Sequence, residues 1–173
     1  MSILEKFSRI KLLAFDLDGV LTNGKLLIMP DGEWVREMDI KDGFALQHAI
    51  KSGLHIAIIT GSSSEPIGKR LNKLGIQEYF QNTGSKAAVL QSLMQKFNLQ
   101  KDEVLFMGDD IPDLEAFEVS GCKTCPADAV TEIMGMADYI SPKKGGDGCA
   151  RDVIEKVMKC RDIWTNSTNT QSI

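Results

Sequence analysis

The 173-residue sequence has no excess of basic side chains, because 24 Asp and Glu residues outnumber 20 Lys and Arg residues. Broad binding to nucleic acid or to an anionic membrane depends on clustered Lys and Arg. The formal net charge of −4 therefore argues against both partners. A small anionic ligand is compatible with this charge, since it needs only a local positive site.

Long hydrophobic runs are also absent. No stretch approaches the roughly 20 apolar residues that a membrane-spanning helix needs. The N-terminal segment MSILEKFSRIKLLAF lacks the uninterrupted apolar run and the small-residue cleavage site of a signal peptide. We therefore expect a cytoplasmic protein with no membrane partner.

Histidine and cysteine, which build most zinc and redox sites, are scarce, with 2 His and 4 Cys. Cys122 and Cys125 form a lone C-x-x-C without a second pair. Only His48 and His55 are left to supplement it. We therefore expect reduced structural thiols rather than a zinc or redox site.

The hydrophobic content of 43% is enough for one continuous core. Short apolar runs typical of buried strands occur at 11–15, 55–59 and 104–107, and weaker ones near Tyr79 and Tyr139. Helical spacing separates them, at 43–52, 65–74, 87–97 and 150–159. This alternation predicts an α/β fold, a three-layer Rossmann-like parallel sheet with helices on both faces. We expect one domain over residues 1–164 and a flexible polar tail over 165–173.

Polar segments follow three of the predicted strands directly. They are Asp16-Leu17-Asp18, Thr60-Gly61-Ser62 and Gly108-Asp109-Asp110. In a parallel sheet the ligand site lies beyond the carboxyl ends of the strands. We therefore expect these polar groups to converge on one edge of the sheet.

Asp16 and Asp18 flank Leu17 at a strand end, where alternation places both carboxylates on one side of the backbone. Two carboxylates so close repel each other unless a cation neutralises them. Mg²⁺ does so, because it favours a few carboxylate oxygens together with water and substrate phosphate. The alternative is that Asp-Leu-Asp-Gly is simply a turn.

A second acidic segment, GDDIPD at 108–113, favours the metal site. Asp110 or Asp113 can cap the helix that follows, but capping does not require three acids. One shared cation explains all of these acids more economically. The predicted ligands of Mg²⁺ are Asp16, Asp18 and Asp109.

Phosphoryl transfer also needs donors for the phosphate oxygens, because charge spreads over them in the transition state. Thr60 and the amides of Gly61 and Ser62 lie at a strand-to-helix junction and can supply them. Lys86 opens the next predicted helix and can add a positive charge. Alone, each feature is weak, since Thr-Gly is common in loops and a first-turn Lys is usually solvated surface.

Together these segments resemble the haloacid dehalogenase superfamily of aspartate-nucleophile phosphatases, over nearly the whole chain. The matching residues are DLDGVLT at 16–22, Thr60-Gly61, Lys86, and GDD at 108–110 with Asp113. The resemblance implies that Asp16 attacks phosphorus, while Asp18 protonates the leaving alkoxide and later activates water. It also implies phosphate-binding roles for Thr60, Gly61 and Lys86, and supporting roles for Asp110 and Asp113.

The spacing of the motifs leaves no room for a separate cap domain. The spare segment, 21–40, is long enough for a hairpin flap, with a turn at Pro30-Asp31-Gly32. This spacing predicts a capless core. A capless chain resembles the branch of 3-deoxy-D-manno-octulosonate 8-phosphate phosphatases, and segments 39–44 and 145–154 also match that branch. That branch implies a homotetramer whose active sites are completed by neighbouring subunits.

Two features bear on assembly and on the substrate. The apolar hairpin can pack against another chain, with the glycine loop 145–148 reaching a neighbouring cavity; alternatively, the hairpin folds onto its own domain. Arg70 and Lys73 match positions where the branch presents basic groups to a substrate carboxylate. Alternatively, they are ordinary exposed helix charges.

The branch resemblance implies hydrolysis of 3-deoxy-D-manno-octulosonate 8-phosphate in lipopolysaccharide precursor synthesis. Ser62 stands where many such members have Arg, so a nonulosonate 9-phosphate of the 2-keto-3-deoxynononic or N-acylneuraminic type is the alternative substrate. A non-catalytic regulatory or assembly module is disfavoured by the intact acids and Lys86. A receiver-like signalling domain is disfavoured by Asp18, which would speed loss of the phosphate.

Overall fold

The computed structural model describes residues 1–164, and its centre is a six-stranded sheet in the order β5-β4-β1-β6-β7-β8. Every neighbouring pair of strands is parallel. The strands are β1 (Leu12–Phe15), β4 (His55–Ile59), β5 (Glu78–Phe80), β6 (Val104–Met107), β7 (Cys122–Cys125) and β8 (Tyr139–Ile140). The predicted α/β class is confirmed.

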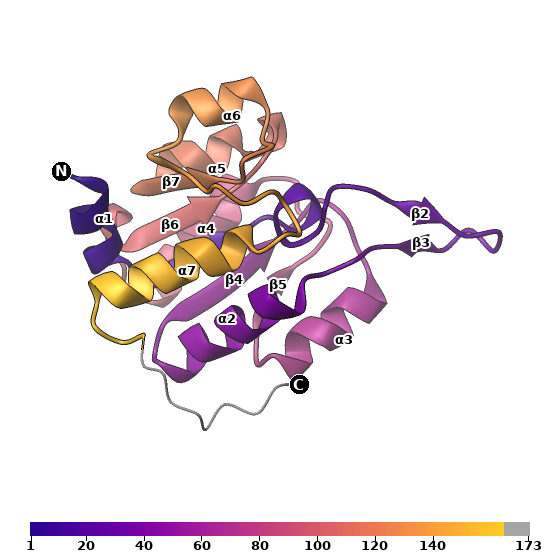
Figure 1. Ribbon diagram of the computed structural model, residues 1–173, viewed down its shortest axis with the longest axis horizontal. Helices are drawn as coiled ribbons and strands as arrows, with labels where there is room; N and C mark the ends of the chain where they lie inside the picture. The colour runs from indigo at the N-terminus through magenta and orange to yellow at the C-terminus, as the bar shows by residue number, and fades with distance from the viewer. Residues whose placement is uncertain (165–173) are drawn as a thin grey trace.

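Helices cover both faces of this sheet (Figure 1). One face carries α1 (Ile3–Arg9), α2 (Ile40–Lys51), α3 (Glu65–Lys73) and α7 (Cys149–Cys160). The other carries α4 (Lys86–Lys96), α5 (Leu114–Val119) and α6 (Thr131–Met136). Short helical turns η1 (Leu17–Leu21), η2 (Lys101–Glu103) and η3 (Ile111–Asp113) complete the connections.

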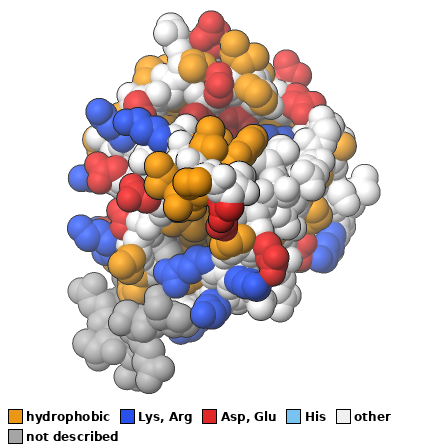
Figure 2. Space-filling model, turned by 90° about the vertical axis from the view of Figure 1, so that its right-hand side faces the viewer, with side chains coloured by type: hydrophobic (Ala, Val, Ile, Leu, Met, Phe, Trp, Pro, Cys, Tyr) orange, Lys and Arg blue, Asp and Glu red, His pale blue; other side chains and the backbone are white. Residues whose placement is uncertain are grey.

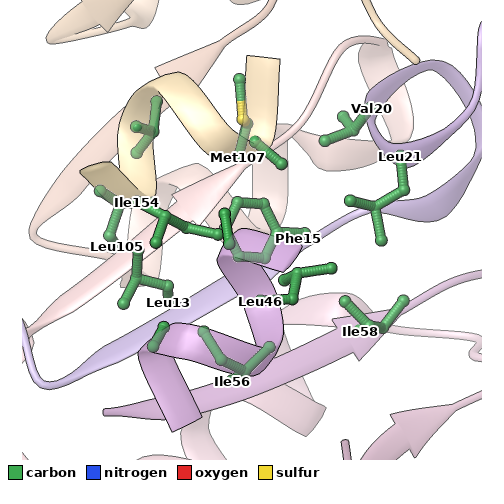
Figure 3. Close-up of a cluster of buried hydrophobic side chains, with 14 of the residues drawn as sticks. Leu13, Phe15, Val20, Leu21, Leu46, Ile56, Ile58, Leu105, Met107 and Ile154 are labelled. Atoms are coloured by element: carbon green, nitrogen blue, oxygen red, sulfur yellow. The ribbon is translucent and has the colours of Figure 1, made fainter. Parts of the chain in front are cut away.

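Strand alternation divides the core into two clusters. Leu13 and Phe15 of β1 point to the face of α2 and α7, where Figure 3 shows them packed with Leu46 and Ile154. The alternate residues Leu12 and Ala14 point to the opposite face, toward α4 and α5. Burying each such side chain contributes about 1.5–3 kcal/mol. The central strands are therefore buried on both faces, which explains why they are continuous apolar runs.

The sequence did not predict α1, α6 or β7. The strand β7 reads CKTC, which lacks the apolar run by which the other strands were recognised. Cys122 belongs to one core cluster and Cys125 to the other, so the two thiols lie on opposite faces of the sheet. Burial raises the pKa of Cys122 to about 12 and that of Cys125 to about 11. Both are free, buried thiols, consistent with the structural role expected.

The segment between β1 and α2 forms the predicted hairpin, with β2 (Leu27–Ile28) antiparallel to β3 (Trp34–Val35). Gly32 closes the turn with a positive φ of 86°, and its amide donates to Met29 O at 2.9 Å. The hairpin extends away from the sheet (Figure 1). Leu27, Ile28 and Trp34 are exposed, whereas Met38 packs against the core of its own chain.

Among residues 1–164, no helix is long and apolar enough to traverse a bilayer. The cytoplasmic location stays a prediction. The predicted flexible tail, 165–173, lies outside the described residues.

Candidate active site

A cavity of about 420 Å³ opens at the carboxyl edge of the sheet. Asp16 follows β1, Thr60 follows β4, and Asp109 comes two residues after β6. The amide of Asp16 continues the sheet by donating to Met107 O at 2.9 Å. The cavity is lined by Asp16, Asp18, Gly24, Thr60, Gly61, Ser62, Thr83, Gly84, Lys86, Asp109, Asp110, Pro112, Asp113 and Glu115. The three polar segments therefore converge as their positions predicted.

The chain turns sharply after Asp16, through η1. Gly19 has a positive φ of 93°, and a Cβ there would lie 2.0 Å from Asp109 Oδ2. The Asp109 carboxylate thus rests directly against the backbone of this turn. Glycine is required at position 19 both for its conformation and for this close approach.

The glycine loop supports the same turn from behind. A Cβ at Gly145 would lie 1.9 Å from Gly19 O, and one at Gly146 would lie 2.5 Å from Asn23 N. The amide of Gly146 donates to Val20 O at 2.9 Å. These two glycines pack within their own chain, and the reach of loop 145–148 into a neighbouring cavity stays a prediction.

Lys86 is the cation at the floor of the cavity. Its Nζ lies 2.8 Å from Asp16 Oδ1 and 2.6 Å from Asp113 Oδ1, and the side chain is almost fully buried. Burial lowers the pKa of Lys86, but the carboxylates of Asp16 and Asp113 outweigh it, so the net shift is upward. Lys86 is therefore a charged, buried group and not the solvated surface residue of the alternative interpretation.

Glu115 fixes the start of α4, the helix that carries Lys86. Its Oε1 accepts from the amide of Lys86 at 2.8 Å, and its Oε2 accepts from Ser85 Oγ at 3.1 Å. Nothing in the sequence points to this role, because Glu115 belongs to none of the motifs.

Three carboxylates meet beside Lys86. Oxygens of Asp16, Asp109 and Asp113 lie within 4.8 Å of one another. Asp113 has both oxygens engaged, Oδ1 by Lys86 and Oδ2 by the amides of Asp109 at 2.9 Å and Asp110 at 3.4 Å. Asp109 Oδ1, in contrast, is buried and has no hydrogen-bond partner within residues 1–164. Asp16 and Asp109 therefore retain the capacity to bind a cation, while Asp113 supports the loop behind them.

Burial and neighbouring acids shift the pKa values of Asp16 and Asp109 upward. Burial, followed by the charge of Asp113, raises the pKa of Asp16 to about 6 against the opposing effect of Lys86. Burial, followed by the charges of Asp16 and Asp113, raises the pKa of Asp109 to about 7. Among the described residues, the cavity lining holds six carboxylates and one ammonium. A hard divalent cation fits this donor set, because it replaces carboxylate repulsion with attraction.

Asp18 lines the same cavity, but its carboxylate is outside the three-carboxylate group. Arg36 Nε donates to Asp18 Oδ1 at 2.6 Å, and Arg36 Nη2 donates to Oδ2 at 3.2 Å. Ser62 Oγ also donates to Oδ2, at 2.8 Å. The role of Asp18 as a metal ligand therefore stays a prediction.

Thr60 is buried at the end of β4, and its Oγ1 accepts from the amide of Ser62 at 3.1 Å. That amide, which was predicted to face the phosphate, is thus engaged within the loop. Gly61 is exposed and lines the cavity. Asp110 also lines the cavity, and its Oδ1 accepts from the amide of Ile111 at 2.7 Å, which is the capping role considered as an alternative.

Arg70 and Lys73 do not line the cavity. Lys73 is exposed on α3. Arg70 packs over the start of α2, where a Cβ at Gly43 would lie 2.9 Å from its Nη2. Their predicted contact with a substrate carboxylate stays a prediction.

Arg36, like Glu115, is a residue of the site that the sequence did not reveal. It lies outside every motif, directly after β3, where the chain returns from the hairpin toward α2 within hydrogen-bonding distance of Asp18. Nothing in the periodicity of the segment distinguishes it from an exposed hairpin charge.

Comparison with known proteins identifies relatives of this chain. The family profile of haloacid dehalogenase-like hydrolases matches residues 43–127. The 3-deoxy-D-manno-octulosonate 8-phosphate phosphatase of Escherichia coli (strain K12) is 30% identical over 156 residues, which span 90% of this chain and 83% of the relative.

Solved structures agree over the same extent. The 3-deoxy-D-manno-octulosonate 8-phosphate phosphatase of Yersinia pestis superposes with a TM-score of 0.90 at 28% identity, covering 93% of this chain and 87% of that one. The Moraxella catarrhalis enzyme of the same name superposes with a TM-score of 0.89 at 33% identity, covering 92% of each chain. That structure is a complex with magnesium ion, phosphate ion and KDO.

Proposed function

The chain is a phosphatase of the 3-deoxy-D-manno-octulosonate 8-phosphate phosphatase family of haloacid dehalogenase-like hydrolases, and we propose that it hydrolyses this sugar-acid phosphate with Mg²⁺. The supporting observation is the buried Asp16 carboxylate, held by Lys86 on the wall of the cavity. We place this reaction in lipopolysaccharide precursor synthesis and assign it to one catalytic domain over residues 1–164.

Asp16 is the nucleophile in this proposal. Lys86 holds one of its oxygens at 2.8 Å, which keeps the carboxylate ionised and fixes its direction of attack. Asp16 forms a bond to phosphorus as the bond to the sugar oxygen breaks. Thr60, Gly61 and Lys86 bind the transferring oxygens.

Asp18 donates a proton to the leaving alkoxide and then takes one from the water that attacks the aspartyl-phosphate. Phosphate leaves, and Asp16 is regenerated. The position of Asp18 on the cavity wall, on the same turn as Asp16, supports its role in proton transfer.

Asp16 and Asp109 would hold the magnesium ion, together with Asp18 as predicted from the sequence. When bound, the ion offsets the repulsion between these acids and the substrate phosphate. The unpartnered Asp109 oxygen and the raised pKa values of Asp16 and Asp109 support this assignment.

The nonulosonate 9-phosphate is the second candidate substrate, and Ser62 is the observation that favours it. Ser62 carries a short side chain that is turned to Asp18. A smaller group at this position leaves room for a longer sugar acid.

We also propose a homotetramer. The hairpin exposes a group of apolar side chains on one side of the molecule, over which Figure 2 shows hydrophobic atoms gathered. The group consists of Leu26, Leu27, Ile28, Met29, Trp34 and Val35. An isolated two-stranded hairpin is marginal in water, and a neighbouring subunit would cover both this surface and the open cavity. Arg70 and Lys73 would reach a substrate carboxylate in that assembly.

The test is phosphate release from 3-deoxy-D-manno-octulosonate 8-phosphate and from 2-keto-3-deoxynononate 9-phosphate, with Mg²⁺ and with EDTA. We expect Mg²⁺-dependent turnover and a specificity constant at least tenfold higher for the eight-carbon substrate. Asp16→Asn should abolish turnover, because an amide cannot act as an anionic nucleophile.

Asp31→Asn in the hairpin turn is the matched control, since the same chemical change there lies outside the cavity. A higher specificity constant for the nine-carbon substrate would transfer the assignment to the second candidate. Failure to hydrolyse either substrate in the presence of Mg²⁺ would overturn the proposed function.

A further inference from the structure

The carboxylate of Asp18 is held by Arg36 in a two-pronged ion pair. Nε and Nη2 of Arg36 donate to the two oxygens of Asp18 at 2.6 and 3.2 Å. The Arg36 side chain is only 3% exposed, whereas that of Asp18 is 33% exposed. The guanidinium therefore lies in the protein, and Asp18 keeps one side open to the cavity.

Such a pair is the strongest geometry available to Arg and a carboxylate. It also occupies both oxygens of Asp18, one of which must face the leaving oxygen during proton donation. With Ser62 Oγ on Oδ2 as well, three donors converge on this carboxylate. The leaving oxygen consequently competes with these donors for Asp18, and its access to the carboxylate widens when the guanidinium gives up one of its contacts.

The guanidinium then needs another acceptor, because a buried charge without partners is costly. The leaving group is the part of the substrate that must lie beside Asp18. A sugar acid offers hydroxyl and carboxylate oxygens at that place, whereas a simple alkyl group offers none.

A polar group near the Arg36–Asp18 pair lacks a hydrogen-bond partner among the described residues. Tyr79 Oη is buried and unbonded among the described residues. The charges of Arg36 and Asp18 both act on its pKa, which burial raises. The surroundings of Arg36 therefore contain hydrogen-bonding capacity that the protein alone does not use, as expected of a surface that meets a polar ligand.

We propose that Arg36 is a specificity-determining residue that exchanges its ion pair with Asp18 for oxygens of the sugar-acid leaving group. This deepens the proposed function and rests on it. Substrates with acceptor oxygens near the phosphoester release Asp18, and substrates without them leave it paired. The hairpin thereby takes part in substrate selection from within the same chain.

The test compares two phosphate monoesters that both need an acid catalyst, 3-deoxy-D-manno-octulosonate 8-phosphate and n-propyl phosphate. Arg36→Met removes the hydrogen-bond donors and keeps a long side chain. Arg36→Lys keeps the positive charge but loses the paired nitrogen donors of the guanidinium. We expect the specificity constant for the sugar-acid phosphate, divided by that for n-propyl phosphate, to fall at least tenfold in Arg36→Met. The fall should come mainly from a higher KM for the sugar-acid phosphate. Arg36→Lys should retain part of the selectivity.

Lys25→Met is the matched control, because Lys25 is an exposed hairpin cation outside the cavity; its ratio should equal that of the wild type. Circular dichroism checks that each variant is folded. An unchanged ratio in Arg36→Met, or an equal loss on both esters, would overturn the proposal and leave Arg36 as a support for Asp18. If the wild type preferred the nine-carbon ester, the proposed substrate would fail, and the same ratio measured with that ester would still test Arg36.

Discussion

Replacing Asp109 with asparagine should stabilise the metal-free protein. Burial and neighbouring acids raise the pKa of Asp109 from 3.8 to about 7. At about 1.4 kcal/mol per pH unit, the ionised carboxylate costs at most about 4 kcal/mol of folding free energy. Asp109 is partly exposed, so screening by solvent reduces this, and we expect a gain of about 2–3 kcal/mol for Asp109→Asn.

The pH dependence follows from the sign of the shift. The folded protein binds the Asp109 proton more tightly than the unfolded chain does, so the cost is complete above pH 7 and disappears as the pH falls toward 3.8. The advantage of Asp109→Asn should therefore be large at pH 8 and smaller at pH 5. Near the melting temperature, 1 kcal/mol corresponds to about 2–4 °C for a chain of this size.

The assay is thermal unfolding in EDTA, at both pH values, for wild type, Asp109→Asn and the control Asp110→Asn. Asp110 is an exposed neighbour whose capping oxygen an amide retains, and its charge is the smallest of the three acidic charges that raise the pKa of Asp109, so its variant should gain much less stability than Asp109→Asn. Saturating Mg²⁺ should stabilise wild type but not Asp109→Asn. If metal-free Asp109→Asn were no more stable than wild type at pH 8, the inference of an uncompensated charge would be wrong.

Four further predictions concern the acid, the metal, the assembly and the core. Asp18→Asn should slow turnover of an alkyl phosphate by about 100- to 10,000-fold; near wild-type rates would remove Asp18 from proton transfer. Asp109→Ala should raise the Mg²⁺ concentration for half-maximal activity far more than Asp113→Ala, since both oxygens of Asp113 are already engaged; equal shifts would contradict this assignment. Trp34→Glu should dissociate the homotetramer in light scattering and reduce selectivity for the sugar acid, whereas a fully active, equally selective monomer would refute the shared site. Met38→Glu should instead lower the melting temperature, because Met38 packs against its own core.

The strands and the cavity were predictable because each has a local signature. The runs at 55–59 and 104–107 match β4 and β6 residue for residue, since strands buried on both faces must be apolar throughout. Parallel topology then brings their carboxyl ends together, which placed Thr60 and Asp109 at one edge.

Elements without such a signature were missed. The strand β7 contains Lys123, and the short helix α1 depends on a capping box between Ser2 and Glu5 more than on periodicity. The helix α2 begins at Ile40, earlier than predicted, because Asp39 caps it by accepting from the amide of Lys41 at 2.6 Å.

Contacts between distant segments could not be predicted from the sequence, for a different reason. Arg36 and Asp18 are 18 residues apart, and their pairing depends on the path of the hairpin rather than on any local pattern. The glycine loop likewise meets Gly19 across more than a hundred residues. Only the folded chain shows that these glycines are required by close approach of two backbones.

The covalent role of Asp16 is the central claim, and trapping the intermediate tests it most directly. Asp18→Asn should react with p-nitrophenyl phosphate, whose leaving group needs little protonation, but should lose the base that activates water. Acid quenching followed by peptide mass spectrometry should then find one phosphoryl group on the peptide that contains Asp16, removable by hydroxylamine. Asp16→Asn in the same background is the control and should carry none. Phosphate release at wild-type rates from Asp16→Asn, or a phosphoryl group on another residue, would contradict the mechanism.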